Sequence, residues 1–443
     1  MSEPIRNSID GGVFGGPVIQ ARTVNVTRFG GEPAHQGRWP KQVGAVPEVA
    51  DAYRPRSPDL DSVGAAAVVL AGMPGSGKTQ LAAHYAHGQL RRQRVDLVLW
   101  VSVTSRAAVE QAYTQAAVEL GLSQPANAES LLAWLRTADR RWLVVLDDVL
   151  DPADLRALWP PANRLGHTVV TTRRRDPSLR TADRRIVEVE PFGEADSVAY
   201  LADRLTPHGL DEPAGRLAEL AADLGHLPLA LAQASAHLID RSDSGVTVAG
   251  YRARLAEHRP LAELAPDRAA LPDGQERSLA EILAEALSRA DAATGSLATP
   301  VLQLASVLHP DGVPVDVLTS EPARLYCADA TAEAVHETLR TLHRLSLVTR
   351  TNDLLRVHRL VQWAAHDSVP SAARRAQLVE LAALALTTAW TTGPLDRETV
   401  RIRRANHRAL AARHPEVSGG TSSDTLAMLE QAAALLETAA TAP

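Results

Sequence analysis

The chain has 443 residues, enough for two to four domains of ordinary size. Its hydrophobic fraction of 45% and charged fraction of 22% are typical of a globular protein. The net charge of -6 gives no electrostatic reason to expect tight nucleic-acid binding across the whole surface. The single cysteine, Cys327, excludes an internal disulfide and a cysteine-rich zinc site. The sequence contains neither a secretory signal pattern nor an apolar run of about 18 residues, so we expect a cytoplasmic protein without a membrane span.

The composition and periodicity of the first 190 residues change at two points. Residues 1–40 are Gly-rich and are predicted to be a leader, either flexible or folded into short strands. Residues 41–60 contain several prolines and are predicted to be a loop approaching a domain. From residue 65 onward, short apolar runs alternate with helical stretches, which predicts a parallel sheet covered on both faces. The runs are AAAVVLA (65–71), LVLWVSV (97–103), RWLVVLD (141–147), HTVVTT (167–172) and RIVEV (185–189).

After residue 190 the strand pattern gives way to amphipathic stretches, which predict a helical domain over 191–277. Residues 278–370 combine further helical stretches with two strand-like runs, LSLVTR (345–350) and DLLRVH (353–358). Helices followed by a small hairpin predict a winged-helix domain. Residues 371–443 are predicted to be a C-terminal helical segment interrupted by the loop PEVSGGTSSD (415–424).

The loop after the first apolar run carries a phosphate-binding motif. Residues 72–79 read GMPGSGKT and match G-x-x-x-x-G-K-[ST] between a strand and a helix start. Glycines let backbone amides surround phosphates, and a helix N-terminus favours anions. Lys78 is expected to reach the β- and γ-phosphates and Thr79 to ligate Mg²⁺. We therefore predict an α/β P-loop domain over 41–190 that binds ATP or ADP through Gly72, Pro74, Gly75, Ser76, Gly77, Lys78, Thr79 and Gln80.

Two further runs end in residues that suit the same site. RWLVVLD leads into Asp147 and Asp148; the first is expected to hold Mg²⁺ and the second to orient or deprotonate a water. A helix N-cap is the alternative for acids at a strand end. Arg173 follows HTVVTT and is expected to contact the γ-phosphate, although Arg174 and Arg175 leave a surface basic cluster as the alternative. The predicted catalytic residues are Lys78, Asp147, Asp148 and Arg173.

Two weaker motifs lie in the helical part. Pro228, in GHLPLA (225–230), offers a flat apolar surface that suits packing against adenine, but the same residues suit an ordinary helix start. His358, in LRVHRL (355–360), stands at the edge of a helix, where a histidine is more often structural than a ligand.

Taken in order, these motifs resemble those of the NB-ARC ATPases, a branch of the STAND signalling NTPases. GMPGSGKTQLA is similar to their Walker A, LVVLDDV to their Walker B, VVTTRR to sensor 1, GHLPLAL to the GLPLA motif and VHRLVQ to the Met-His-Asp motif. The resemblance covers about residues 41–370. It implies three domains closed around ADP, with Pro228 against adenine and His358 near the β-phosphate. It also implies that exchange of ADP for ATP opens the molecule.

The chain departs from that family in two places. Val357-His358-Arg359 keeps the histidine of Met-His-Asp but replaces the acid with arginine. Where many relatives have V-G-R-E, this chain has Val-Gly-Ala-Val-Pro at 43–47, similar to a variant in actinobacterial repeat proteins. That variant implies Val43 and Val46 on the adenine side. The sequence ends where tetratricopeptide repeats begin in those relatives.

The favoured function is a molecular switch with slow ATPase activity in signalling, regulation or defence. The resemblance implies a monomer with ADP, a homo-oligomer with ATP, and an unidentified protein trigger. One alternative is a DNA-binding ATPase that uses the winged helix, with residues 401–404 as a local basic patch. The other is a conventional P-loop kinase, which the helical and winged-helix parts argue against. Neither DNA nor a membrane is the favoured partner.

Overall fold

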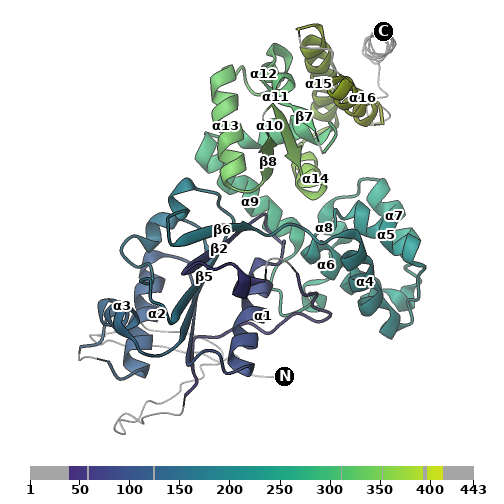
Figure 1. Cartoon of the computed structure of the whole chain (residues 1–443). Helices are drawn as coiled ribbons and strands as arrows, with labels where there is room; N and C mark the ends of the chain where they lie inside the picture. Colours follow the sequence, from purple (N-terminus) through teal and green to yellow (C-terminus); the bar gives the residue numbers. More distant parts are fainter. Residues whose placement is uncertain are drawn as a thin grey trace, which may run out of the picture. The chain divides into compact units, whose positions relative to one another are not determined.

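The computed structural model describes residues 39–56, 59–122, 125–310, 312–351, 353–392 and 397–412 (Figure 1). Nearly all of the predicted leader, 1–40, and the whole predicted loop at 415–424 therefore lie outside the described residues. None of the helices in these ranges combines the length and the apolar character that crossing a bilayer requires.

A six-stranded parallel sheet forms the first part of the described chain. Its order is β1-β3-β4-β5-β2-β6. The strands are β1 (Lys41–Val43), β2 (Ala67–Ala71), β3 (Leu97–Ser102), β4 (Trp142–Val149), β5 (Gly166–Thr172) and β6 (Arg184–Glu188). Strands β2 to β6 are the five apolar runs of the sequence, so the predicted parallel sheet is confirmed.

Helices cover both faces of this sheet because its strands are apolar on both sides. They are α1 (Lys78–Arg91), α2 (Arg106–Glu119) and α3 (Ala128–Thr137). Neighbouring residues of β2 face opposite clusters: Val68 and Leu70 pack with α1, whereas Val69 packs with the cluster that includes α2 and α3. Burying one such aliphatic side chain contributes about 1.5–3 kcal/mol, so these two cores hold the loops at the sheet edge in place.

Strand β1 lies within the segment predicted to be a loop, and that prediction is wrong for residues 41–43. Lys41 pairs with Leu97 of β3, and its amide donates to the carbonyl of Asp96 at 2.8 Å. Val43 is only 3% exposed. A strand of three residues flanked by prolines is too short to show a strand periodicity in the sequence. Its position is set by pairing with the edge of β3.

The rest of the described chain is mainly helical, as predicted. Its helices are α4 (Glu194–Leu205), α5 (Ala214–Asp223), α6 (Pro228–Asp240), α7 (Val248–Ala256), α8 (Leu261–Leu264), α9 (Leu279–Thr294), α10 (Ala298–Ser306), α11 (Val315–Thr319), α12 (Glu321–Tyr326), α13 (Ala332–Arg344), α14 (Arg359–Asp367), α15 (Ala372–Thr392) and α16 (Arg397–Ala412). A small antiparallel sheet has the order β7 (Val313–Pro314), β9 (Leu354–Val357) and β8 (Val348–Thr351).

Strands β8 and β9 form the hairpin that the two runs before residue 358 predicted. One apolar cluster extends from Tyr200 in α4 to Leu410 in α16, so the predicted boundaries at 277/278 and 370/371 divide a continuous core. Those boundaries, and the winged-helix assignment of 278–370, stay predictions.

Candidate functional site

The phosphate-binding motif forms a tight loop between β2 and α1. The Lys78 ammonium donates to the carbonyls of Gly72 and Met73, both at 2.8 Å. Burial, reinforced by the nearby Arg173, lowers the pKa of Lys78 to about 7. A phosphate beside the ammonium would favour its charged form and compete for these two hydrogen bonds.

Gly75 shows why this loop needs glycine. Its φ of 79° lies in the left-handed region. A Cβ at this position would come within 2.9 Å of Cβ of Leu229 in α6. The Leu229 amide also donates to the Gly75 carbonyl at 3.2 Å, so the phosphate loop and the start of α6 are in direct contact.

Asp147, Thr79 and Thr171 meet because β5 lies between β4 and β2 in the sheet. The hydroxyls of Thr79 and Thr171 donate to Oδ1 of Asp147 at 2.8 and 2.6 Å. Burial raises the pKa of Asp147, and the two hydroxyl hydrogen bonds oppose that rise. Hydroxyl and carboxylate oxygens are ligands that Mg²⁺ prefers, so Thr79 and Asp147 fit the predicted metal.

Asp148 turns toward Arg173 at a break in β4. The register of the strand shifts between Leu146 and Val149, and Asp148 has a φ of 55°, which aspartate tolerates better than most residues. Both of its carboxylate oxygens accept hydrogen bonds from Arg173, at 3.2 Å each. The arginine thus faces the pocket, while Arg174 pairs with Asp176 instead.

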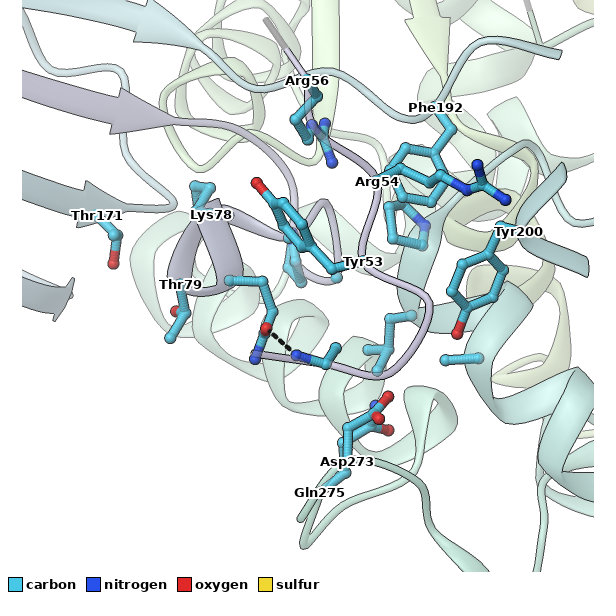
Figure 2. A pocket seen from close by; sticks show the side chains of 18 of the residues that line it. Tyr53, Arg54, Arg56, Lys78, Thr79, Thr171, Phe192, Tyr200, Asp273 and Gln275 are labelled. Atoms are coloured by element: carbon cyan, nitrogen blue, oxygen red, sulfur yellow. Dashed lines mark hydrogen bonds between the residues drawn. The ribbon is translucent and has the colours of Figure 1, made fainter. Parts of the chain in front are cut away.

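A segment before the phosphate loop closes one side of the pocket; we call residues 48–56 the strap. The strap is held by Gln80 of α1, whose side-chain oxygen accepts from the Ala50 amide at 2.7 Å, the dashed line in Figure 2. Val43 and Val46 do not line this cavity, so their expected place on the adenine side stays a prediction. Val43 is used in the sheet core, and Val46 packs against the cluster beside α1.

Arg56 of the strap contacts the phosphate loop directly. Its guanidinium donates to the Ser76 carbonyl at 2.7 Å and to the Glu190 carbonyl, and it lies 5.1 Å from the ring centre of Phe192 (Figure 2). Sequence reasoning missed Arg56. The only signal was an arginine between two prolines, which does not distinguish a loop anchor from a solvated side chain.

Residues of the strap, the phosphate loop, β4, β5 and α6 surround a cavity of about 370 Å³, a size that suits a small ligand. Lys78, Thr79, Asp147, Asp148 and Arg173 gather in one part of it. The strap and α6 supply other walls, together with a loop before α9; these lining residues include Ala50, Tyr53, Pro228, Leu229, Ala232, Asp273 and Gln275. The arrangement therefore combines an anion-binding end with apolar and amide-bearing walls.

His358 lies beside a neighbouring cavity rather than among these residues. Its Nε2 is 2.9 Å from the carbonyl of Gly225, the first residue of the GHLPLA motif. This second cavity also borders Gly72 and Met73, on the outside of the phosphate loop. Contact between His358 and a β-phosphate stays a prediction.

A parallel sheet with a phosphate loop after β2, two acids near the end of β4 and the polar end of β5 between them defines a P-loop nucleotide-binding domain. Residues 57–206 match the model of the NB-ARC domain. The chain thus carries an NB-ARC domain, as its motifs predicted. Residues 290–374 match a second model, described as a domain of unknown function. No curated protein matches the chain.

Several solved structures are distantly similar. The Walker-type ATPase of Pyrococcus abyssi is 12% identical, with a TM-score of 0.46 over 68% of this chain and 91% of that one. A STAND protein with a tetratricopeptide repeat sensor from Pyrococcus horikoshii is 14% identical, with a TM-score of 0.35 over 89% and 59%. The RuvB Holliday junction motor of Thermotoga maritima is 14% identical, with a TM-score of 0.33 over 66% and 83%. These similarities are too distant to support an argument.

Proposed function

We propose that this chain is an ATP/ADP-binding switch in which exchange of the nucleotide changes the contacts between the NB-ARC domain and the helical part. The observation that carries the proposal is the composition of the pocket wall. The phosphate loop and Asp147 come from the sheet, whereas Pro228 and Leu229 come from α6. A ligand in this cavity would touch both parts at once, so its phosphates could alter how firmly they hold together.

In this proposal, different residues bind different parts of the nucleotide. Lys78 neutralises the β- and γ-phosphates, and Pro228 packs against the base. Thr79 and Asp147 hold Mg²⁺, which would supply charge neutralisation at the phosphates. Arg173, now paired with Asp148, would exchange that partner for a γ-phosphate, which frees Asp148 to orient a water.

Slow hydrolysis would then return the protein to its ADP state. We propose that ADP is retained by a closed monomer and that ATP favours an open form able to assemble with further copies. A trigger protein would act by favouring the open form, in signalling, regulation or defence.

The DNA-binding alternative is weakened by the basic patch at 401–404. Arg403 is only 3% exposed, and its guanidinium donates to the Ala389 carbonyl of α15 at 3.4 Å. One of the three arginines in that patch is therefore directed inward, as part of the packing of α16 on α15.

The proposal is tested by denaturing the purified protein and identifying the nucleotide that is released. We expect close to one ADP per chain from the wild type and almost none from Lys78→Ala. Lys41→Ala is the matched control, because Lys41 and Lys78 are the only lysines and Lys41 lies at the sheet edge. Absence of bound nucleotide combined with rapid ATP turnover would overturn the switch.

A further inference from the structure

We propose that Asp273 and Gln275 read the edge of the nucleobase and select a 6-aminopurine over a 6-oxopurine. Both residues line the pocket and come from the connection between α8 and α9. Figure 2 shows them well away from Lys78 and Thr79. The inference rests on the proposed function, because it assumes that the phosphates lie at Lys78.

The orientation of the Gln275 amide follows from its buried neighbour Gln233, which is 3% exposed. The backbone amide of Leu279 donates to the side-chain oxygen of Gln233 at 2.8 Å. Gln233 must therefore present its NH₂ group on the other side, where it donates to Oε1 of Gln275 at 2.8 Å. Because its oxygen is engaged, Gln275 offers its own NH₂ group as a donor.

Asp273 offers the complementary acceptor. Its Oδ1 accepts a hydrogen bond from the Asp51 amide of the strap at 3.1 Å. Among the described residues, no hydrogen bond engages Oδ2 of Asp273. A carboxylate accepts and never donates while it is ionised. The pocket edge therefore carries one donor, from Gln275, and one acceptor, from Asp273.

Adenine matches this pair, since its 6-amino group donates and its N1 accepts. A 6-oxopurine presents the reverse order, an acceptor at position 6 and a donor at N1, and its O6 would face the Asp273 carboxylate. The base would lie against apolar atoms of Pro228, Leu229 and Ala232, which line the same pocket. The strap holds the reading edge in place, because Arg204 of α4 donates to the Asp51 carboxylate at 2.6 Å.

The test compares the affinities of the full-length protein for ADP and for inosine diphosphate, which differ in the 6-amino and 6-oxo groups and the N1 proton. We expect the wild type to prefer ADP by about tenfold, the usual worth of one hydrogen bond to a charged group. In Asp273→Ala the preference should disappear through weaker ADP binding. Asp273→Asn keeps an oxygen for the Asp51 amide and places an NH₂ group toward position 6 of the base. It should remove the preference for ADP, because each base then makes one matched contact: adenine at N1 with Gln275, the 6-oxopurine at O6 with the asparagine.

Glu276→Gln is the matched control, because Glu276 is an exposed acid of the same connection outside the pocket lining. It should keep the wild-type preference.

Three results would overturn the inference. Equal loss of both nucleotides in Asp273→Ala, with wild-type affinities in Asp273→Asn, would mean that Asp273 only positions the strap. If Asp273→Ala weakens the binding of ADP but not of 2′-deoxy-ADP, Asp273 would be assigned to the ribose 2′-hydroxyl instead of the base. A wild type that binds ADP without preference would exclude base reading. If the wild type binds neither nucleotide, the proposed function itself fails, which the ADP measurement alone reveals.

Discussion

Thr171 of β5 binds both acidic residues of β4 through a single hydroxyl. That hydroxyl donates to Asp147 at 2.6 Å and accepts from the Asp148 amide at 2.8 Å. Thr171→Val keeps the shape but removes both hydrogen bonds, so we expect a loss of about 1–3 kcal/mol in unfolding free energy. We also expect weaker Mg²⁺ dependence of nucleotide binding, measured by calorimetry with and without the ion.

Thr338→Val serves as the control for that substitution. Thr338 is also buried and donates to the Ala334 carbonyl at 2.8 Å, but it lies in α13, outside the pocket lining. It should lose stability without changing the response to Mg²⁺. Equal Mg²⁺ dependence in both variants would contradict the role assigned to Thr171.

Cys327 provides a reporter of local opening because it is the only cysteine. It is 2% exposed, and burial raises the pKa of its thiol to about 12. Thiolate is the reactive form, so we expect Ellman's reagent at pH 8 to label the native protein at least about a hundredfold more slowly than the unfolded chain. Rapid labelling without denaturant would show that the region around α12 is open in solution.

Arg175 ties the end of the β5 segment to the region around β8. Its side chain pairs with Glu188 of β6 at 2.7 Å and donates to the Val348 carbonyl at 3.0 Å. Its backbone amide donates to the Arg344 carbonyl at 2.8 Å. The segment that carries Arg173 is thus bonded directly to the α13–β8 connection.

Removing that side chain should loosen the connection. We expect Arg175→Ala to increase hydrogen exchange over residues 343–351, measured by mass spectrometry, because the Val348 carbonyl loses its partner. Arg174→Ala is the control, since Arg174 pairs with Asp176 two residues further along. If both variants exchange alike over 343–351, Arg175 does not hold this connection.

The same elements show what could be predicted from the sequence. Strands β2 to β6 could be predicted because each is a run of apolar residues. Lys78, Thr79 and Asp147 could be predicted as one site because the ends of neighbouring parallel strands meet at one edge of the sheet. The strap and the Asp273 loop carry no such periodicity. Their positions depend on hydrogen bonds across long sequence distances, such as Asp51 to Asp273, which no local pattern encodes.

At the scale of the whole described chain, three apolar clusters matter. Two belong to the faces of the parallel sheet, and one unites α4 to α16. Relative movement is therefore expected between the sheet domain and the helical part rather than within the helical part. His358 stands at the start of α14, a helix whose Leu360 belongs to the large cluster. Its ring nitrogen Nε2 lies 2.9 Å from the Gly225 carbonyl.

His358→Ala should speed ADP release several-fold, because it removes one contact that holds the GHLPLA motif in place. The rate is measured by displacing a fluorescent ADP analogue. His208→Ala, at an exposed position after α4, should release ADP at the wild-type rate. An unchanged rate in His358→Ala would remove this histidine from the switch.

The strap also has a practical consequence for dividing the protein. The NB-ARC match begins at residue 57, whereas the strap ends at residue 56 and β1 begins at residue 41. A fragment cut at the family boundary would keep the phosphate loop and lose Arg56, the Ala50–Gln80 hydrogen bond and one edge strand of the sheet. Such a fragment should fold less stably and bind nucleotide more weakly than one begun at Trp39. A fragment meant to bind nucleotide with full affinity should therefore begin before the NB-ARC match does.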